Sequence, residues 1–214
     1  MLHKEPDIVS AETFLLIQQL QATPELNNFY LAGGTALALQ LGHRNSIDID
    51  LFSRLDFDSA MIISFLNSRF SFREIFVRKN TIIGLINNIK VDFIVHPYEN
   101  INAPITEEGI TFLSKEDITA MKLNAIINSG QRLKDFIDIY FLLEYFSIED
   151  MLVFFEKKYP NVNTLIALKA ISYFGDIDET IDSPRLTKPL PVEKIKKRIT
   201  EAVKNTHKVF RHST

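Results

Sequence analysis

The stretch LAGGTALALQLGHRNSIDIDLF, residues 31–52, carries the pattern on which both the fold and the function depend. It ends in an apolar segment that contains Asp48 and Asp50. Successive side chains of a β-strand alternate between faces, so these two carboxylates project from the same side. The buried face of the same strand is predicted to hold Ile47, Ile49 and Leu51. Two adjacent carboxylates repel each other unless a cation lies between them, and Mg²⁺ favours such oxygen ligands. The alternative is a pair of solvated aspartates at a strand end.

The beginning of the stretch predicts a close turn. Gly33 and Gly34 follow a short apolar segment, and two glycines allow the backbone to approach a ligand closely. Thr35 is expected to cap a helix over residues 36–41 and to donate its hydroxyl to a phosphate oxygen, while the free N–H groups of that helix bind phosphate. A Gly-Gly pair alone is commonly only a turn. Its position, with Thr35 13 residues before Asp48, favours a phosphate and metal site.

A third carboxylate lies in the most apolar segment of the chain. Asp92 is surrounded by the sequence IKVDFIV, residues 89–95, and a buried carboxylate requires a partner. If this strand lies beside residues 47–52, Asp92 completes a three-carboxylate cluster that can hold two metal ions for phosphoryl transfer. The alternative is a salt bridge to a nearby lysine or arginine.

The remaining pattern predicts an α+β fold. In the first half, helices are expected at residues 10–22 and 59–70, and strands at residues 29–32, 72–78, 81–86 and 89–96. The strands 72–78, 81–86 and 89–96 are separated by Lys79-Asn80 and Asn87-Asn88, which suit tight hairpins, so about five strands form a small mixed or antiparallel sheet. In the second half, Ser114 and Asp117 resemble a capping box. Helices are predicted there at residues 114–128, 133–145, 148–159, 162–174 and 192–203, with a loop at 176–191. We therefore expect a core domain at residues 1–112 and a helical domain at 113–214.

Composition narrows the class of protein. The 214 residues include no cysteine, which excludes disulfides and thiolate sites. Neither a signal peptide nor an apolar run of membrane-spanning length is recognisable, so a cytoplasmic location without a membrane partner is expected. The net charge is −3, yet the C-terminal segment is basic. Such a run is typical of a solvated helix and also of an arm that contacts RNA phosphates.

The motifs together resemble the AbiEii/AbiGii toxin family of the DNA polymerase β-like nucleotidyltransferase superfamily. The Gly-Gly-Thr turn, the segment Gly42-His43-Arg44 and the Asp48-Ile49-Asp50 pair match the family signature. The resemblance extends to MKLNA, residues 121–125, and to RLKDFIDIY, residues 132–140, and covers about residues 28–146.

The resemblance implies a nucleotidyltransferase-type fold and a Mg²⁺-dependent transfer of a nucleotide from an NTP. Members are toxins of abortive-infection or toxin–antitoxin pairs, which implies a cognate antitoxin, and some modify tRNA. Carried onto this chain, Asp48 and Asp50 bind Mg²⁺, with Asp92 as a further ligand placed by strand pattern. The NTP phosphates contact the Gly-Gly-Thr turn and Arg44. The downstream motifs supply Lys122, Asp135 and Asp138.

The residues themselves support part of this assignment. Asp135 and Asp138 are one helical turn apart, next to apolar positions, and favour a nearby cation such as Lys122. A structural ion pair within the helices is the alternative. Two rival functions also fit the chain: a catalytically silent NTP-binding or interaction module of the same fold, and a transferase acting on a protein or small-molecule hydroxyl.

Overall fold

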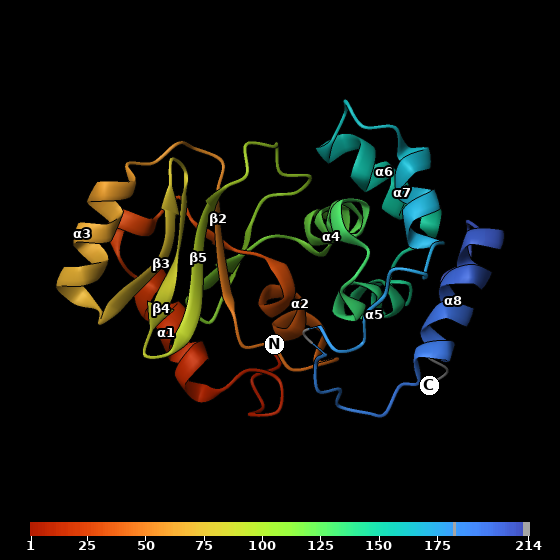
Figure 1. Ribbon diagram of the computed structural model, residues 1–214, viewed down its shortest axis with the longest axis horizontal. Helices are drawn as coiled ribbons and strands as arrows, with labels where there is room; N and C mark the ends of the chain where they lie inside the picture. Colours follow the sequence, from red (N-terminus) through yellow and green to blue (C-terminus); the bar gives the residue numbers. More distant parts are fainter. Residues whose placement is uncertain (182, 212–214) are drawn as a thin grey trace. The chain divides into compact units, whose positions relative to one another are not determined.

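The computed structural model describes residues 1–181 and 183–211 (Figure 1). It divides into two compact units. The N-terminal unit comprises Met1–Glu99 and Ala103–Leu113, and the C-terminal unit comprises Asn100–Asn102 and the chain from Ser114 onward. None of the helices in the described ranges is long and apolar enough to cross a membrane.

The N-terminal unit is built on one sheet of seven described strands, in the order β3-β4-β5-β2-β1-β7-β6. The strands are β1 (Tyr30–Leu31), β2 (Ile49–Ser53), β3 (Phe72–Arg78), β4 (Thr81–Ile86), β5 (Ile89–Val95), β6 (Ile105–Glu107) and β7 (Ile110–Phe112). Pairing is antiparallel except at β2·β5 and β1·β7. The α+β fold class is confirmed. The two short strands β6 and β7 are additional to the predicted ones, because three residues carry too little alternation to reveal a strand.

Asparagines in the hairpin turns and a serine at the start of the first helix account for much of the local structure of this unit. Asn80, Asn87 and Asn88 adopt φ values of 62°, 51° and 64°, as the predicted tight hairpin turns require. Ser10 accepts a hydrogen bond from the backbone N–H of Thr13 and so caps the first helix. The helices of this unit are α1 (Ala11–Gln21), α2 (Gly33–Leu41) and α3 (Ser59–Arg69), with a 3₁₀ turn at Pro24–Leu26.

Two predicted details within residues 31–52 are wrong. Helix α2 begins at Gly33 rather than after Thr35, and its N-cap is Ala32, whose side chain cannot cap. Strand β2 begins at Ile49, and Ile47 is 67% exposed instead of facing the core. The alternation rule therefore applies from Ile49 onward, and Asp48 lies one residue before the strand.

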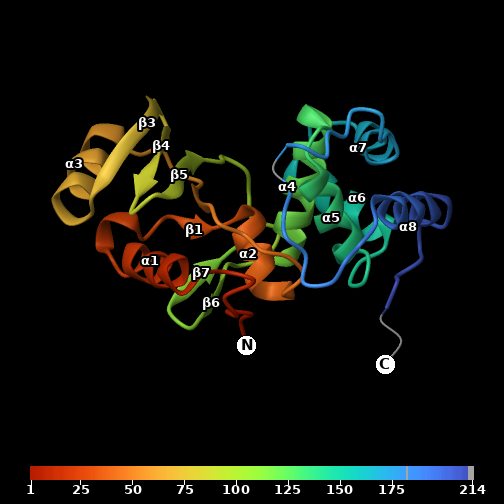
Figure 2. The ribbon, with the colours of Figure 1, turned by 60° about the horizontal axis from the view of Figure 1, so that its bottom comes forward.

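The sheet has a buried side and a side that is only half covered. Ile49, Leu51, Ile82, Val91 and Phe93 are fully buried, whereas the alternate positions of β2 and β4 are half-buried. In Figure 2, α1 and α3 lie together on one side of the sheet. Helices that pack on one face leave the other face available for a site, and that face carries Asp50 and Asp92.

The C-terminal unit is helical in its described part. Its helices are α4 (Lys115–Ser129), α5 (Leu133–Leu142), α6 (Ile148–Lys158), α7 (Thr164–Ile171) and α8 (Val192–Lys204). All five correspond to predicted helical patterns, although α5 and α7 each end three residues earlier than expected. The predicted loop at residues 176–191 contains no helix, and its residue 182 lies outside the described residues.

The start of α4 differs from the predicted capping box. Ser114 does cap the helix by accepting from the N–H of Asp117. The Asp117 carboxylate instead accepts hydrogen bonds from the backbone N–H groups of Ile101 and Asn102, at 3.0 and 3.3 Å. It also pairs with Lys158 at 2.7 Å, and both side chains are fully buried. Asp117 therefore binds three segments of this unit together.

Candidate active site

The turn between β1 and α2 brings the backbone against an aspartate. Gly33 has a φ of +64°, a conformation that favours glycine. A Cβ atom on Gly33 would lie 2.2 Å from Oδ2 of Asp50. The N–H of Ala32 donates to the carbonyl of Asp50 at 2.8 Å, which holds the turn against β2. Glycine is needed at this position both for the backbone angle and for the space that the carboxylate occupies.

The second glycine and the threonine organise the segment before β2. A Cβ on Gly34 would lie 2.5 Å from Nη2 of Arg44, whose side chain is buried. Thr35 is fully buried, and its hydroxyl is within hydrogen-bonding distance of the Ser46 hydroxyl at 2.8 Å and of the carbonyl of Asp48. The threonine therefore positions the backbone that carries Asp48. This contact was not anticipated from the sequence.

Asp50 and Asp92 lie side by side across two parallel strands. They are direct register partners of β2 and β5, so they project from the same face at the strand spacing of about 4.8 Å. The predicted neighbourhood of these two strands is confirmed. Asp92 is 7% exposed, and its Oδ1 atom is buried without a hydrogen-bond partner. An unsatisfied buried carboxylate oxygen is costly, and a cation would satisfy it.

Lys90 joins this group of carboxylates, although no sequence motif pointed to it. Its Nζ donates to Oδ2 of Asp92 at 2.6 Å. Burial lowers the pKa of Lys90, but the hydrogen bond to Asp92 and the negative charges of Asp92, Asp50 and Asp48 outweigh that effect and raise it. All three predicted carboxylates thus act on one ammonium group. The spacing of Lys90 and Asp92, two residues apart on one strand, was the only signal in the sequence.

The donor set fits a hard divalent cation that also binds substrate phosphates. Mg²⁺ is commonly held by one or two carboxylates, with phosphate and water oxygens completing its shell. Asp50 and Asp92 supply two carboxylates on one face, with Asp48 just before β2. Among residues 1–181 and 183–211, no three acidic or histidine side chains already form a metal cage.

The downstream residues form a buried ion cluster within the C-terminal unit. Lys122 of α4 pairs with Asp135 at 2.8 Å and with Asp138 at 2.7 Å, both on α5. Arg132, just before α5, contacts the other oxygen of Asp135 at 2.9 Å. The Asp138 side chain is fully buried. The expected cation beside the two carboxylates is therefore Lys122, and the cluster also ties α4 to α5.

The sequence is similar to those of known proteins. The sequence model of the family described as "Nucleotidyl transferase AbiEii toxin, Type IV TA system" matches residues 15–205. An uncharacterized protein of Aquifex aeolicus is 35% identical over 161 residues, which cover 72% of this chain and 78% of that protein.

Two crystal structures from Helicobacter pylori share the fold. JHP933 superposes with a TM-score of 0.55 at 16% identity, covering 92% of this chain and 93% of its own. A protein named "putative nucleotidyltransferase" gives a TM-score of 0.52 at 17% identity, covering 92% of this chain and 96% of its own.

Proposed function

The chain belongs to the AbiEii family of nucleotidyl transferase toxins of type IV toxin–antitoxin systems, and we propose that it transfers a nucleoside monophosphate from an NTP to RNA, with the 3′ end of a tRNA as the acceptor. The observation that carries this proposal is the placement of Asp50 beside Asp92, with an unsatisfied oxygen, directly against the Gly33 turn. Binding alone would not require paired carboxylates at a phosphate-binding turn.

The proposed metal ligands are Asp48, Asp50 and Asp92. Mg²⁺ bound there would offset charge on the NTP phosphates and lower the pKa of the acceptor hydroxyl. Gly34 and Thr35 lie in the first turn of α2, where backbone N–H groups have no acceptor within the helix, and we propose that these two N–H groups bind the phosphates. Arg44, buried behind Gly34, adds positive charge beneath the turn.

The transfer itself is a single displacement at phosphorus. The acceptor hydroxyl oxygen forms a bond to the α-phosphorus, and the bond from that phosphorus to the pyrophosphate oxygen breaks. The hydroxyl proton passes to solvent, and pyrophosphate leaves with the electron pair of the broken bond. The side chains of the site contribute position and charge rather than a covalent intermediate.

For the cluster in the C-terminal unit we propose a supporting role in NTP binding. Asp135 and Asp138 hold Lys122 in one orientation, because two short ion pairs restrict its flexible side chain. An ammonium group fixed in this way can offset phosphate charge without first losing rotational freedom. The competing explanation is a purely structural cluster, and the variants in the Discussion separate the two.

The test is a transfer assay with each labelled NTP in turn, Mg²⁺, and either total tRNA or the protein alone. Label in RNA supports the proposal, whereas label on the protein would identify a self-modifying enzyme. Asp50→Asn and Asp92→Asn should abolish transfer. Asp56→Asn is the matched control, since Asp56 is an exposed carboxylate of the same unit that pairs with Lys79. The metal site would be refuted if wild type transfers nothing and Asp50→Asn binds Mn²⁺ and NTP as tightly as wild type.

The family assignment also bears on partners and location. A toxin of a toxin–antitoxin system has a cognate antitoxin, so we propose an antitoxin as the second partner of this chain. NTPs and tRNA are abundant in the cytoplasm, and we place the activity there.

A further inference from the structure

The half-covered face of the sheet extends well beyond the carboxylates. Register places Phe76, Ile83 and Asp92 in one row across β3, β4 and β5, and Asp50 continues that row on β2. At a strand spacing of about 4.8 Å, Phe76 lies roughly 10 Å from Asp92. Phe76 is 48% exposed although it is a large apolar side chain.

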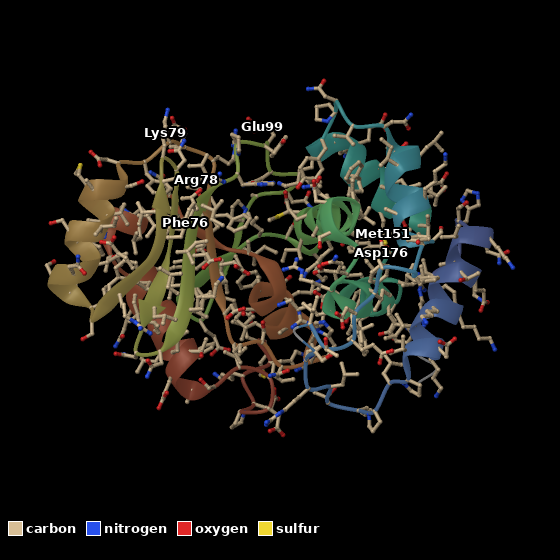
Figure 3. The ribbon with its side chains drawn as sticks, viewed as in Figure 1. Phe76, Arg78, Lys79, Glu99, Met151 and Asp176 are labelled. Atoms are coloured by element: carbon tan, nitrogen blue, oxygen red, sulfur yellow. The ribbon has the colours of Figure 1, made fainter. Side chains whose placement is uncertain are left out.

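The two neighbouring rows carry positive charge. On one side, Arg73, Leu85 and Lys90 are register partners. On the other side, Arg78 faces Thr81, and its guanidinium lies 6.0 Å from the ring of Phe76. Figure 3 shows Phe76 and Arg78 along β3, with Lys79 at the end of the hairpin.

Among the residues of β2, β3, β4 and β5, the acidic side chains on this face are those of the proposed metal site. Glu99, which follows Tyr98, pairs with Arg54. Glu74 pairs with Gly84, which belongs to the opposite, buried set of positions together with Val91. The strand β3 therefore presents arginines and an aromatic ring beside the site while its glutamate belongs to the other face. Such a combination matches a phosphate backbone with unpaired bases.

A second aromatic group follows the carboxylates along β2 and β5. Phe52 is two residues after Asp50 and projects from the same face. Its ring lies 5.7 Å from that of His96, which in turn lies 4.8 Å from the ring of Tyr98. Tyr98 is 39% exposed. Aromatic rings thus lie on both sides of the proposed metal site: Phe76 across the strands on β3, and Phe52 and His96 further along, on β2 and just after β5.

We propose that this face, defined by Arg73, Phe76, Arg78, Phe52, His96 and Tyr98, binds the single-stranded end of the RNA acceptor, with its bases stacked on the rings and its phosphates contacting the arginines. The proposal rests on the proposed function, because it assigns the acceptor of the same site. Stacking requires bases that are not paired, so a single strand is preferred to a duplex.

Binding can be measured separately from transfer. The probe is a fluorescein-labelled eight-nucleotide RNA of mixed sequence, titrated by anisotropy against the Asp50→Asn protein in EDTA, where no transfer occurs. Phe76→Leu should weaken binding roughly tenfold, and Phe76→Tyr should retain it, because the ring and not its bulk is required. Arg73→Ala should reduce the slope of the logarithm of the RNA association constant against the logarithm of salt concentration by about one, the value of one lost phosphate contact.

Val77→Ala is the matched control, because Val77 neighbours Phe76 on β3 and belongs to the opposite face. An RNA affinity equal to that of the parent protein in Phe76→Leu and Arg73→Ala would overturn the proposal, even if wild type labels tRNA. A loss of affinity in these variants with no transfer by wild type would instead support the RNA-binding face and refute the proposed reaction. Equal affinity for a duplex of the same sequence would also refute stacking.

Discussion

Replacing Gly33 with alanine would test whether the close approach of the turn sets the position of the Asp50 carboxylate. Alanine at a φ of +64° costs about 1–2 kcal/mol in the left-handed region. The new methyl group would also lie 2.2 Å from Oδ2 of Asp50, whereas ordinary contact begins at 3.4 Å. The carboxylate must therefore move by more than 1 Å, and a displacement of that size at a reacting centre costs roughly 100-fold in rate.

Gly109→Ala separates the two effects. Gly109 has a φ of +77°, so alanine there meets a similar backbone penalty. Its Cβ would meet only Nε2 of Gln18, at 3.9 Å, which is an ordinary contact. Any stabilisation from a less flexible unfolded chain is shared by both variants.

Three measurements on the two variants distinguish the backbone penalty from the displacement of Asp50. Urea unfolding should show a loss of about 1 kcal/mol in Gly109→Ala and at least that loss in Gly33→Ala, where the clash with Asp50 adds to the backbone penalty. Mn²⁺ binding, followed by the electron paramagnetic resonance signal of the free ion, should weaken in Gly33→Ala alone. Transfer of label to RNA should fall about 100-fold in the same variant. Wild-type Mn²⁺ affinity and transfer in Gly33→Ala would refute the reasoning, since Asp50 could then not hold the metal from this position.

Three further predictions concern the charged and hydroxyl groups. Lys90→Met should strengthen Mn²⁺ binding about fivefold, because it removes a positive charge worth roughly 1 kcal/mol at 4 Å in water, whereas Lys90→Arg should leave the affinity unchanged. Weaker Mn²⁺ binding by Lys90→Met in a titration would show that the Lys90 ammonium group does not compete with the metal. Lys122→Met should destabilise the protein by about 3–5 kcal/mol in urea unfolding, because the buried Asp138 loses its ion pair with Lys122. Lys158→Met should lose comparable stability but, unlike Lys122→Met, keep NTP affinity at a temperature where both are folded; equal affinities would assign Lys122 a structural role only. Thr35→Val should cost about 1–3 kcal/mol, since the carbonyl of Asp48 loses a buried donor, and an unchanged unfolding midpoint would show that the hydroxyl does not hold that segment.

Much of the local structure was determined by short-range chemistry that a sequence displays directly. Ser10 caps α1 because a hydroxyl three residues before an N–H satisfies it regardless of the rest of the chain. Asn80, Asn87 and Asn88 tolerate positive φ, so the hairpins β3-β4 and β4-β5 form where expected. The helix cap predicted at Thr35 is wrong, because the Thr35 hydroxyl contacts the carbonyl of Asp48 instead of capping its own helix.

The chemical character of the protein was likewise contained in the sequence. The Gly-Gly-Thr turn, the segment Gly42-His43-Arg44, the Asp48-Ile49-Asp50 pair and the motifs at residues 121–125 and 132–140 together predicted the family, and the prediction is confirmed. The matched range, residues 15–205, extends through both units of the chain. The assignment of individual residues to catalytic roles stays a prediction until the variants above are measured.

Only the tertiary structure decided which distant residues meet. Asp92 lies beside Asp50 because β5 pairs with β2 in one register, and a shift of one residue would have turned it to the opposite face. The same register brings Lys90 onto the face of Asp50 and lines up Phe76 with the site, and neither follows from any local pattern. The sequence by itself determined the turn, the caps and the chemistry of its motifs, because these depend on neighbours in the chain. Strand order and register depend on the packing of the whole sheet, and they alone brought the carboxylates, the lysine and the exposed ring onto one face.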